Sequence, residues 1–298
     1  MSKKILISGA SGFTGRHFIQ LANKLGYQCI ALCHRENDII SGCSDVVVAD
    51  LTNKDELKCQ LLKVKPDFIV HLAAISFVKH GNVADIYQTN LLGTVNLLDC
   101  LIELDYPINK VLLASSGNVY GNNTQLPILE CSQPEPVNDY AVSKCAMELA
   151  AKVRFEKLPI VVTRPFNYTG VGQAEHFLIP KIVKAFKARM SELELGNLDV
   201  ARDFSDVRDV VSAYIKLLES DACSEVFNIC TGKATPLLTV VERLKELADY
   251  PIEVKVNPDF VRENEIKELY GTNKKLVDAI GDYQQHCFED TLKWMYEE

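Results

Sequence analysis

Residues 4–15 read KILISGASGFTG, an apolar, β-branched run that leads directly into a glycine-rich loop. In this loop Gly9, Gly12 and Gly15 have the spacing GxxGxxG, and an amphipathic helical pattern follows at once. Small residues at such a strand-to-helix turn let the backbone approach a pyrophosphate, and the amino end of the helix favours its negative charge. The stretch therefore predicts the strand, turn and helix that open a dinucleotide-binding fold.

The rest of the first half repeats this alternation of strand and helix. The predicted strands span residues 3–8, 28–33, 45–50, 67–73, 110–116 and 160–165. The predicted helices span 12–25, 53–64, 84–104 and 139–157. Alternation of this kind requires a parallel sheet covered by helices on both faces. We therefore expect an α/β protein with a Rossmann-like, doubly wound parallel sheet.

The alternation loosens after residue 165, where a smaller mixed C-terminal lobe is expected. The predicted elements there are a helix near 175–190, a short strand pair around 193–204, a helix near 206–219, a strand over 224–230 that returns to the sheet, and a helix after 236. We expect a cofactor domain of residues 1–165 plus about 206–232, and a substrate lobe of about 166–205 and 233–298. A cleft at the carboxyl ends of the strands is where such folds bind ligands.

The composition is that of a folded protein. Of 298 residues, 47% are hydrophobic and 24% are charged, which is too apolar for a disordered chain. A net charge of -8 without a local basic patch argues against a nucleic-acid partner. No run reaches the roughly 18 apolar residues of a membrane span, and the apolar part of the N-terminus is too short for a signal peptide. We expect no membrane partner and a cytoplasmic location.

Ten cysteines are scattered through the chain, several of them in apolar segments. They show neither CxxC nor Cys/His ligand spacing, which predicts buried, reduced thiols and no disulfides. We expect no metal site.

The end of the second predicted strand decides between the two dinucleotides. An acid there would bind a ribose 2′-hydroxyl, whereas a cation would pair with a 2′-phosphate. Here Cys33 stands where the acid is expected, His34 and Arg35 follow it, and Arg16 comes directly after the glycine loop. These cations favour NADP(H). NAD(H) is the alternative, with Glu36 on the ribose and both arginines solvated.

Further cofactor contacts are expected where other strands end. Asp50 and Leu51 follow the third strand and are placed beside the adenine, and HLAA at 71–74 ends a strand beside the cofactor. The predicted cofactor-binding residues are Gly9, Ser11, Gly12, Phe13, Thr14, Gly15, Arg16, His34, Arg35, Asp50, Leu51, Leu72, Ala73, Ala74, Asn90, Tyr140 and Lys144.

Three polar residues have the positions of a catalytic group. Ser116 follows the fifth strand, and Tyr140 and Lys144 are four residues apart, on one face of a helix. A free tyrosine has a pKa of about 10, and a nearby cation favours the phenolate. A YxxxK motif alone is common, but the glycine loop, Ser116 and Asn90 together make chance a poor explanation.

From Lys3 to roughly Leu276 the chain resembles the extended short-chain dehydrogenase/reductase family. The resemblance is carried by GASGFTG, HLAA, NLLGTVNLL, SSGNVYG, YAVSK and RPFN. It implies that Ser116 hydrogen-bonds the reacting carbonyl oxygen and that Tyr140 donates or accepts its proton. Lys144 would bind the nicotinamide ribose and tune Tyr140. Ser115 is the less favoured alternative to Ser116.

The second half resembles the nucleotide-sugar branch of this family, particularly its GDP-4-keto-6-deoxymannose reductases. RPFNYTGVGQ, RDFSDVRDVVSAY and VRENEIKELYG carry this resemblance. It implies a substrate site made of Ser76, Ser116, Asn118, Asn167, Arg202, Arg262 and Glu265. For Arg202, the alternative is a salt bridge to Asp203 or Asp206.

The loop after Ser116 separates the activities of this branch. A 4,6-dehydratase needs an acid/base to move the C5 proton and the departing hydroxyl, and resembled dehydratases carry an acid in this loop. Here Gly117 and Asn118 cannot titrate. We therefore expect NADPH-dependent reduction of a C4 ketone on a nucleotide-linked 4-keto-6-deoxy sugar. The alternatives are a GDP-mannose-type 4,6-dehydratase, a 4-epimerase, or a non-enzymatic NADP-binding regulator.

The helices predicted over 84–104 and 139–157 resemble the pair through which this family dimerises. Apolar residues at helical spacing in both helices predict a homodimer through a four-helix bundle. The alternative is that all of these apolar faces pack on their own sheet.

Overall fold

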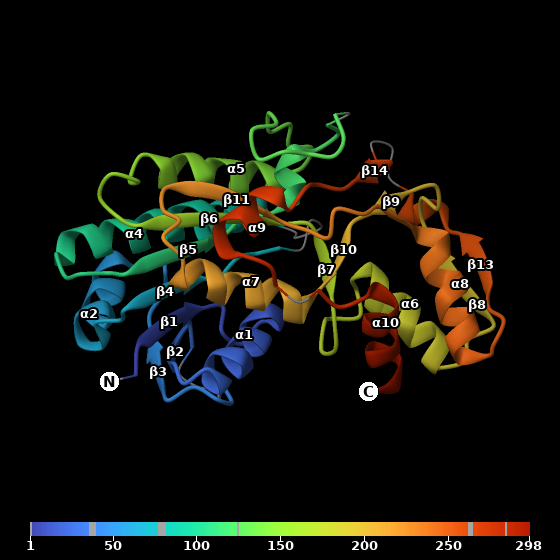
Figure 1. Cartoon of the computed structure of the whole chain (residues 1–298), viewed down its shortest axis with the longest axis horizontal. Helices are drawn as coiled ribbons and strands as arrows, with labels where there is room; N and C mark the ends of the chain where they lie inside the picture. The colour runs from blue at the N-terminus through green and yellow to red at the C-terminus, as the bar shows by residue number, and fades with distance from the viewer. Residues whose placement is uncertain (1, 36–39, 77–81, 124, 262–264, 284) are drawn as a thin grey trace.

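The computed structural model describes residues 2–35, 40–76, 82–123, 125–261, 265–283 and 285–298. Seven parallel strands form the main sheet in the order β11-β6-β5-β4-β1-β2-β3 (Figure 1). They are β1 (Lys4–Ser8), β2 (Gln28–Cys33), β3 (Asp45–Val48), β4 (Phe68–His71), β5 (Lys110–Ala114), β6 (Ile160–Pro165) and β11 (Glu225–Ile229). The strand expected over 224–230 thus joins the sheet beside β6.

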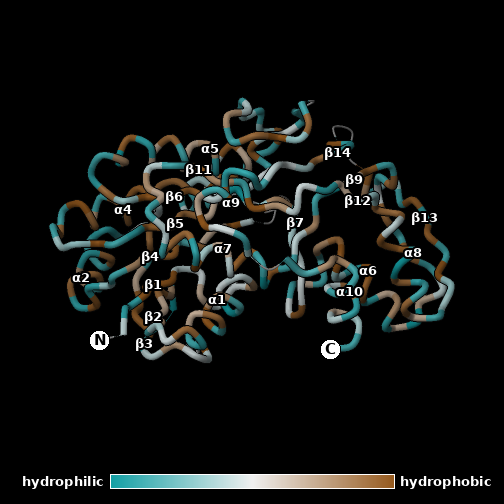
Figure 2. The backbone as a smooth tube through the Cα atoms, in the orientation of Figure 1, coloured by the Kyte–Doolittle hydropathy of each residue, from teal (hydrophilic) through white to brown (hydrophobic). Residues whose placement is uncertain are grey.

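Helices cover both faces of this sheet. They are α1 (Phe13–Lys24), α7 (Val207–Glu219) and α9 (Lys274–Ile280) on one face, and α2 (Lys54–Val64), α4 (Gly93–Leu104) and α5 (Asp139–Lys152) on the other. Alternate residues of β1 enter the two cores, Ile5 and Ile7 on the first face and Leu6 on the second. Because side chains alternate along a strand, a strand buried on both faces is apolar throughout. Figure 2 shows hydrophobic positions gathered along these strands. The doubly wound parallel sheet is confirmed.

The helix expected over 84–104 is divided. It consists of α3 (Val83–Tyr87), a π-helical turn η1 (Gln88–Leu92) and α4. Asn90 lies in the π turn, fully buried, and its side chain hydrogen-bonds both backbone groups of Ile75. The predicted helical stretch is therefore confirmed, but apolar spacing did not reveal its one widened turn.

The second half packs around a core of its own. This core joins α6 (Leu178–Lys187), α8 (Leu237–Ala248), α10 (Phe288–Glu297), β8 (Glu192–Leu195) and β13 (Glu253–Val256). The strand pair expected around 193–204 does not form. Its strands have only two to four residues each, and each takes a partner from a distant part of the chain.

These distant pairings make the second half mixed. β8 pairs in parallel with β13, and β9 (Ala201–Arg202) lies between antiparallel β12 (Thr235–Pro236) and parallel β14 (Glu268–Leu269). β10 (Phe204–Asp206) pairs with β7 (Asn167–Thr169), and this pair lies between the two halves in Figure 1. The division into residues 1–165 plus 206–232 and the remainder stays a prediction.

All ten cysteines are free thiols. Four of them, Cys29, Cys33, Cys100 and Cys230, are buried as expected. The expectation was wrong for Cys59, Cys131, Cys223 and Cys287, which are exposed. In the part of the chain that the structure describes, no helix is long and apolar enough to span a membrane, and no cluster of His, Cys, Asp or Glu has the arrangement of a metal site.

Candidate active site

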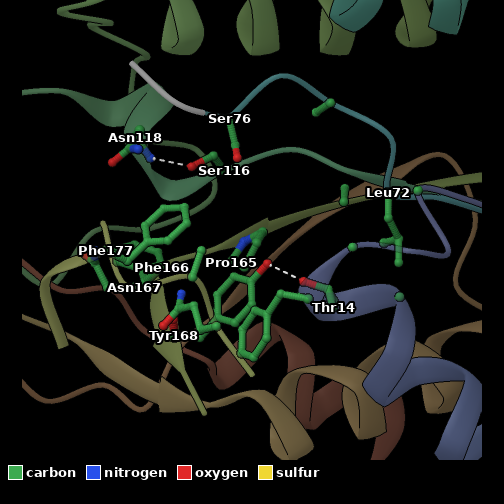
Figure 3. Close-up of a pocket in the computed structure, with 18 of the residues that line it drawn as sticks. Thr14, Leu72, Ser76, Ser116, Asn118, Pro165, Phe166, Asn167, Tyr168 and Phe177 are labelled. Carbon is green, nitrogen blue, oxygen red and sulfur yellow. Dashed lines mark hydrogen bonds between the residues drawn. The ribbon is translucent and has the colours of Figure 1, made fainter. Parts of the chain in front are cut away.

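A cavity of about 500 Å³ lies at the carboxyl ends of β1, β4, β5 and β6 (Figure 3). We call one side the sheet wall: the glycine loop 9–16, residues 72–76 after β4, residues 114–118 after β5, and Tyr140 and Lys144 on α5. The other side is the facing wall, which consists of Pro165, Phe166, Asn167, Tyr168, Gly172, Gln173, Ala174, Phe177, Leu178, Ile179 and Phe204. The cavity is therefore at the edge of the sheet where parallel α/β folds bind ligands.

The glycine loop packs directly on the segment after β4. Gly9 has a φ of +70°, and a Cβ atom there would lie 2.7 Å from the Ala73 nitrogen. A Cβ atom on Gly15 would lie 2.5 Å from the Gly9 carbonyl oxygen. Both positions therefore require glycine, and the loop lies closer to the sheet than any side chain would allow.

The first turn of α1 fits a dinucleotide diphosphate. Its N-cap, Gly12, provides no side-chain cap, and the first turn contains no acidic residue. The amide donors at the start of a helix therefore remain available to an anion, and the helix dipole favours negative charge at this end. Ser11 through Arg16 line the cavity at this point, so the residues present suit the cofactor that the motif predicts.

Ser116, Tyr140 and Lys144 line one cavity although they come from different elements. Ser116 caps η2 (Gly117–Tyr120), where its Oγ accepts a 3.2 Å hydrogen bond from the Asn118 amide. Lys144 Nζ donates to the Ala114 carbonyl at 2.8 Å. The side chain of Ser115 instead donates to Glu148. This contact supports the choice of Ser116 over Ser115.

Burial controls the protonation of the two α5 residues. It raises the pKa of Tyr140 to about 12, with a further increase from Tyr168 and a partly opposing hydrogen bond from Ser116. It lowers the pKa of Lys144 to about 8, against the attraction of Glu148. The expected lowering of the Tyr140 pKa by Lys144 was wrong for this structure, because the desolvation of the phenol is the dominant effect.

The cavity lining is poor in acid/base groups. Among the described residues, its ionisable side chains are Arg16, Tyr140, Lys144 and Tyr168, with no aspartate, glutamate or histidine. Glu130, the nearest acid along the chain after Ser116, instead accepts a hydrogen bond from the Asn228 amide. The arrangement can therefore hold and protonate a carbonyl oxygen, but it offers no carboxylate for a second proton transfer.

Several predicted cofactor residues lie outside the cavity lining. His34 and Asp50 are exposed or half-buried and join through a 3.2 Å contact, and Arg35 is exposed after β2. The backbone of Ala73 packs against Gly9. The carbonyl oxygen of Leu51 accepts a hydrogen bond from the Asn96 side chain. The Asn90 side chain accepts a hydrogen bond from the Ile75 amide in the segment after β4. Glu36 lies outside the described residues.

The predicted substrate residues divide into two groups. Ser76, Ser116, Asn118 and Asn167 line the cavity. Arg202 and Glu265 lie elsewhere and form an ion pair of 2.6 Å. Arg262 lies outside the described residues.

The alternative partners considered for Arg202 were wrong. The carboxylate of Asp203 accepts hydrogen bonds from Thr231 and Gly232, and Asp206 pairs with Arg208.

The sequence analysis missed most of the facing wall. Phe166, Tyr168, Gln173, Phe177 and Phe204 all line the cavity. The Tyr168 ring stacks on Phe13 at 6.0 Å, and its hydroxyl lies 2.8 Å from Thr14 Oγ1 (Figure 3). The position of Tyr168 directly after RPFN was the one available signal.

Comparison with known proteins agrees with this geometry. The model of the NAD dependent epimerase/dehydratase family matches residues 5–230. The chain belongs to this family. It is therefore an NAD(P)-dependent oxidoreductase of the extended short-chain dehydrogenase/reductase type, as the motifs predicted.

Two curated relatives match this family member over nearly its whole length. It is 37% identical to GDP-6-deoxy-D-talose 4-dehydrogenase of Aggregatibacter actinomycetemcomitans, with 98% of this chain and 97% of the relative covered. It is 34% identical to GDP-6-deoxy-D-mannose reductase of Pseudomonas aeruginosa, with coverages of 98% and 96%. Among solved structures, RMD from P. aeruginosa in complex with NADPH has a TM-score of 0.86 and 30% identity, over 99% of this chain and 98% of that one.

Proposed function

We propose that this protein uses NADPH to reduce the C4 ketone of a nucleotide-linked 4-keto-6-deoxy sugar, and that the substrate is GDP-4-keto-6-deoxymannose. The names of the two curated relatives support C4 redox chemistry on a GDP-sugar. Talose and mannose differ only at C4, so oxidation of either 6-deoxy sugar at C4 produces one and the same ketone. That common ketone is the substrate we propose.

Three residues would carry the chemistry. Ser116 would donate its hydroxyl proton to a hydrogen bond with the ketone oxygen. Tyr140, protonated throughout the neutral range because of its raised pKa, would transfer a proton to that oxygen. Lys144 would bind the nicotinamide ribose. Bound NADPH supplies the hydride.

The observation that carries reduction over dehydration is the lack of a carboxylate in the described lining of the cavity. Elimination across C5 and C6 requires a group that accepts one proton and returns another, and an amide such as Asn118 cannot do so at neutral pH. Position 117 is also tightly packed, so an acid there would require the Phe166 ring to shift. A Cβ atom on Gly117 would lie 3.2 Å from the ring of Phe166, before any carboxyl group was added.

The decisive experiment offers the protein two substrates. GDP-4-keto-6-deoxymannose with NADPH should yield the 4-hydroxy sugar, whereas GDP-mannose with NADP should lose no water. Proton NMR of the product would distinguish the talo from the manno configuration. Dehydration of GDP-mannose at a comparable rate would make the protein a dehydratase. Interconversion of C4 epimers without net NADPH consumption would make it an epimerase, and cofactor binding without any turnover would make it a regulator.

We propose NADP(H) as the preferred cofactor, with Arg35 as the partner of the 2′-phosphate. Arg35 is exposed directly after β2, whereas Arg16 donates to the Gly172 carbonyl at 2.9 Å. Arg35→Asp should therefore weaken NADPH about tenfold to a hundredfold relative to NADH, because a charge-assisted contact is replaced by repulsion. Titration of both cofactors would test this. An unchanged ratio, or a wild-type preference for NADH, contradicts the proposal.

For the nucleotide end of the substrate we propose Asn167, Arg202, Arg262 and Glu265, with Ser76 and Asn118 beside the sugar. The two negative charges of a diphosphate need a cation in an otherwise acidic protein. The ion pair with Glu265 fixes the position of the Arg202 guanidinium, which would supply this cation. Arg202→Gln should raise the KM for the GDP-sugar and leave NADPH binding unchanged. An equal loss of both affinities would remove Arg202 from the substrate site.

We also propose a homodimer through a four-helix bundle. α3, η1 and α5 leave Val83, Leu92, Val142, Leu149 and Val153 exposed, and the last is 80% accessible. Apolar side chains on two adjacent helices match a two-fold interface with a second copy of the chain. Light scattering should show a dimer, and Leu149→Glu should yield a monomer. A wild-type monomer at micromolar concentration contradicts the proposal.

A further inference from the structure

His71 is the last residue of β4, directly before Leu72 of the cavity lining, and is 1% exposed. Its Nδ1 lies 2.6 Å from Ser8 Oγ, and its Nε2 lies 2.9 Å from Thr94 Oγ1. These partners come from β1 and α4, so the imidazole joins three elements. Neither His71 nor its two hydroxyl partners has a role in the chemistry proposed above.

The Asn90 carbonyl, at one end of this group, sets the direction of each hydrogen bond along it. The Asn90 carbonyl can only accept, so the Thr94 hydroxyl must donate to it, at 2.8 Å. Thr94 Oγ1 must then accept a hydrogen bond from the protonated Nε2 of His71. In a neutral ring protonated at Nε2, Nδ1 can only accept, so the Ser8 hydroxyl donates to it. Ser8 Oγ in turn accepts a hydrogen bond from the Ala73 amide at 3.3 Å. One neutral tautomer, protonated at Nε2, satisfies all of these contacts.

The imidazole is held neutral by its surroundings. Burial lowers the pKa of His71 to about 3, and the charge of Lys144 adds to this effect. A second proton would sit on Nδ1, so Ser8 Oγ would have to accept from the ring and its hydroxyl would lose Nδ1 as an acceptor.

Both ends of this chain reach the active site. Ala73 is the residue whose backbone packs against Gly9 in the cofactor loop. At the other end, the Asn90 side chain hydrogen-bonds Ile75 and the Ser143 hydroxyl, and Ser143 Oγ donates to the Tyr140 carbonyl at 2.7 Å. The chain thus connects the floor of the cofactor cavity with the turn of α5 that carries Tyr140.

We propose that His71 is a positioning residue: as the neutral Nε2-protonated tautomer, it fixes the segment after β4 against the glycine loop and against α5. It touches neither cofactor nor substrate, and it acts through Ser8 and Thr94. This proposal depends on the proposed function, and on the role of Tyr140, only where it concerns turnover. Imidazole NMR and NADPH binding, both measured without sugar, test it separately.

The first test observes the tautomer. The protein contains six histidines, and ¹⁵N-histidine labelling of the full chain, with His71 assigned by its loss in His71→Gln, would show each imidazole. His71 should be protonated at Nε2 and should not titrate between pH 8 and 5. An Nδ1-protonated ring, or titration in this range, would overturn the proposal.

The second test removes one hydroxyl. Thr94→Val loses the hydrogen bonds of the hydroxyl to His71 and to the Asn90 carbonyl, and it should raise the NADPH dissociation constant about threefold to tenfold. Thr94→Ser retains the hydroxyl and should stay within twofold of the wild type.

Thr291→Val is the matched control for this experiment. Thr291 is equally buried and donates to Asp206, outside the chain of hydrogen bonds around His71, so NADPH affinity should stay unchanged even if the melting temperature falls. If Thr94→Val binds NADPH as the wild type does, or if Thr94→Ser is as weak as Thr94→Val, His71 has no positioning role.

Discussion

The two walls of the cavity are built in different ways. On the sheet wall, polar groups stand where strands end or one helical turn apart, as Ser116 follows β5 and Tyr140 precedes Lys144 on α5. The facing wall is largely apolar, with Phe166 and Phe177 supplied by one irregular segment. From this difference we expect the sheet wall to carry the reaction and the facing wall to select the molecule that fits. Changes to the first should alter kcat, and changes to the second should alter KM.

The largest effect is expected from Tyr140→Phe on the sheet wall. It removes the proton donor and leaves the ring, so kcat should fall about 100-fold to 10,000-fold, while NADPH affinity is retained. Initial rates of NADPH consumption with the 4-keto sugar, together with NADPH titration, would measure both quantities. Turnover within tenfold of the wild type would show that another group donates the proton.

The buried ion pair of Glu148 and Arg164, which contacts Ser115 of the sheet wall, is expected to contribute mainly to stability. Glu148 binds Arg164 through both carboxylate oxygens, at 2.6–3.2 Å, and both side chains are less than 10% exposed. Glu148→Gln leaves the guanidinium buried without its counter-charge and should lower the free energy of unfolding by about 3–5 kcal/mol. Urea denaturation would measure the loss.

Glu103→Gln is the control for this variant. Glu103 pairs with Lys54 and Lys58 on the surface, and such exposed pairs add little to stability. Its denaturation midpoint should match that of the wild type. Equal shifts of the denaturation midpoint in the two variants would mean that the buried Glu148 pair stabilises the protein no more than the exposed Glu103 pairs do.

The pH dependence of turnover should come from Lys144. Its pKa of about 8 means that the ammonium is present below pH 8 and is lost as pH rises through that value. Tyr140, with a pKa of about 12, remains a proton donor throughout. Hence kcat/KM for NADPH should decline above pH 8 and approach about a tenfold loss per pH unit.

Lys144→Met separates the two groups. This variant should have a raised KM for NADPH at pH 7 and no alkaline decline near pH 8. A pH profile from 6 to 10 in both proteins would measure this. If the decline persists in Lys144→Met, a group other than Lys144 causes it.

The smallest effect is expected on the facing wall. Phe177→Ala removes part of the apolar surface beside the cavity and should raise the KM for the nucleotide sugar about threefold to tenfold, with kcat within twofold. Phe260→Ala, at an exposed aromatic residue outside the cavity lining, should change neither constant. A loss of kcat in Phe177→Ala without a change in KM would contradict the division of roles between the walls.

Much of the fold could be read from the sequence because its causes are local. Continuous apolar runs in strands, helical spacing and the glycine loop each depend on residues that are neighbours in the chain. The same holds for the pairing of Tyr140 with Lys144, which needs only one helical turn. These signals predicted the seven strands of the sheet and the location of the cavity lining at their carboxyl ends.

Other features depended on contacts between distant residues. The strands expected to pair around 193–204 are too short to specify a partner, so tertiary contacts assigned them to β13, β12, β14 and β7. The Ser115 hydroxyl donates a hydrogen bond to Glu148, 33 residues away, and this contact supports the prediction of Ser116 over Ser115.

The sequence by itself therefore determined the class of fold, the cofactor loop and the spacing of the reactive groups. The tertiary structure decided how those groups are charged and held. The pKa of Tyr140 is raised, contrary to expectation, because the folded environment removes water from the phenol. The tautomer of His71 depends on Ser8 and Thr94, 63 and 23 residues away. Desolvation and hydrogen-bond direction arise only when such distant segments are packed together, so no local pattern records them.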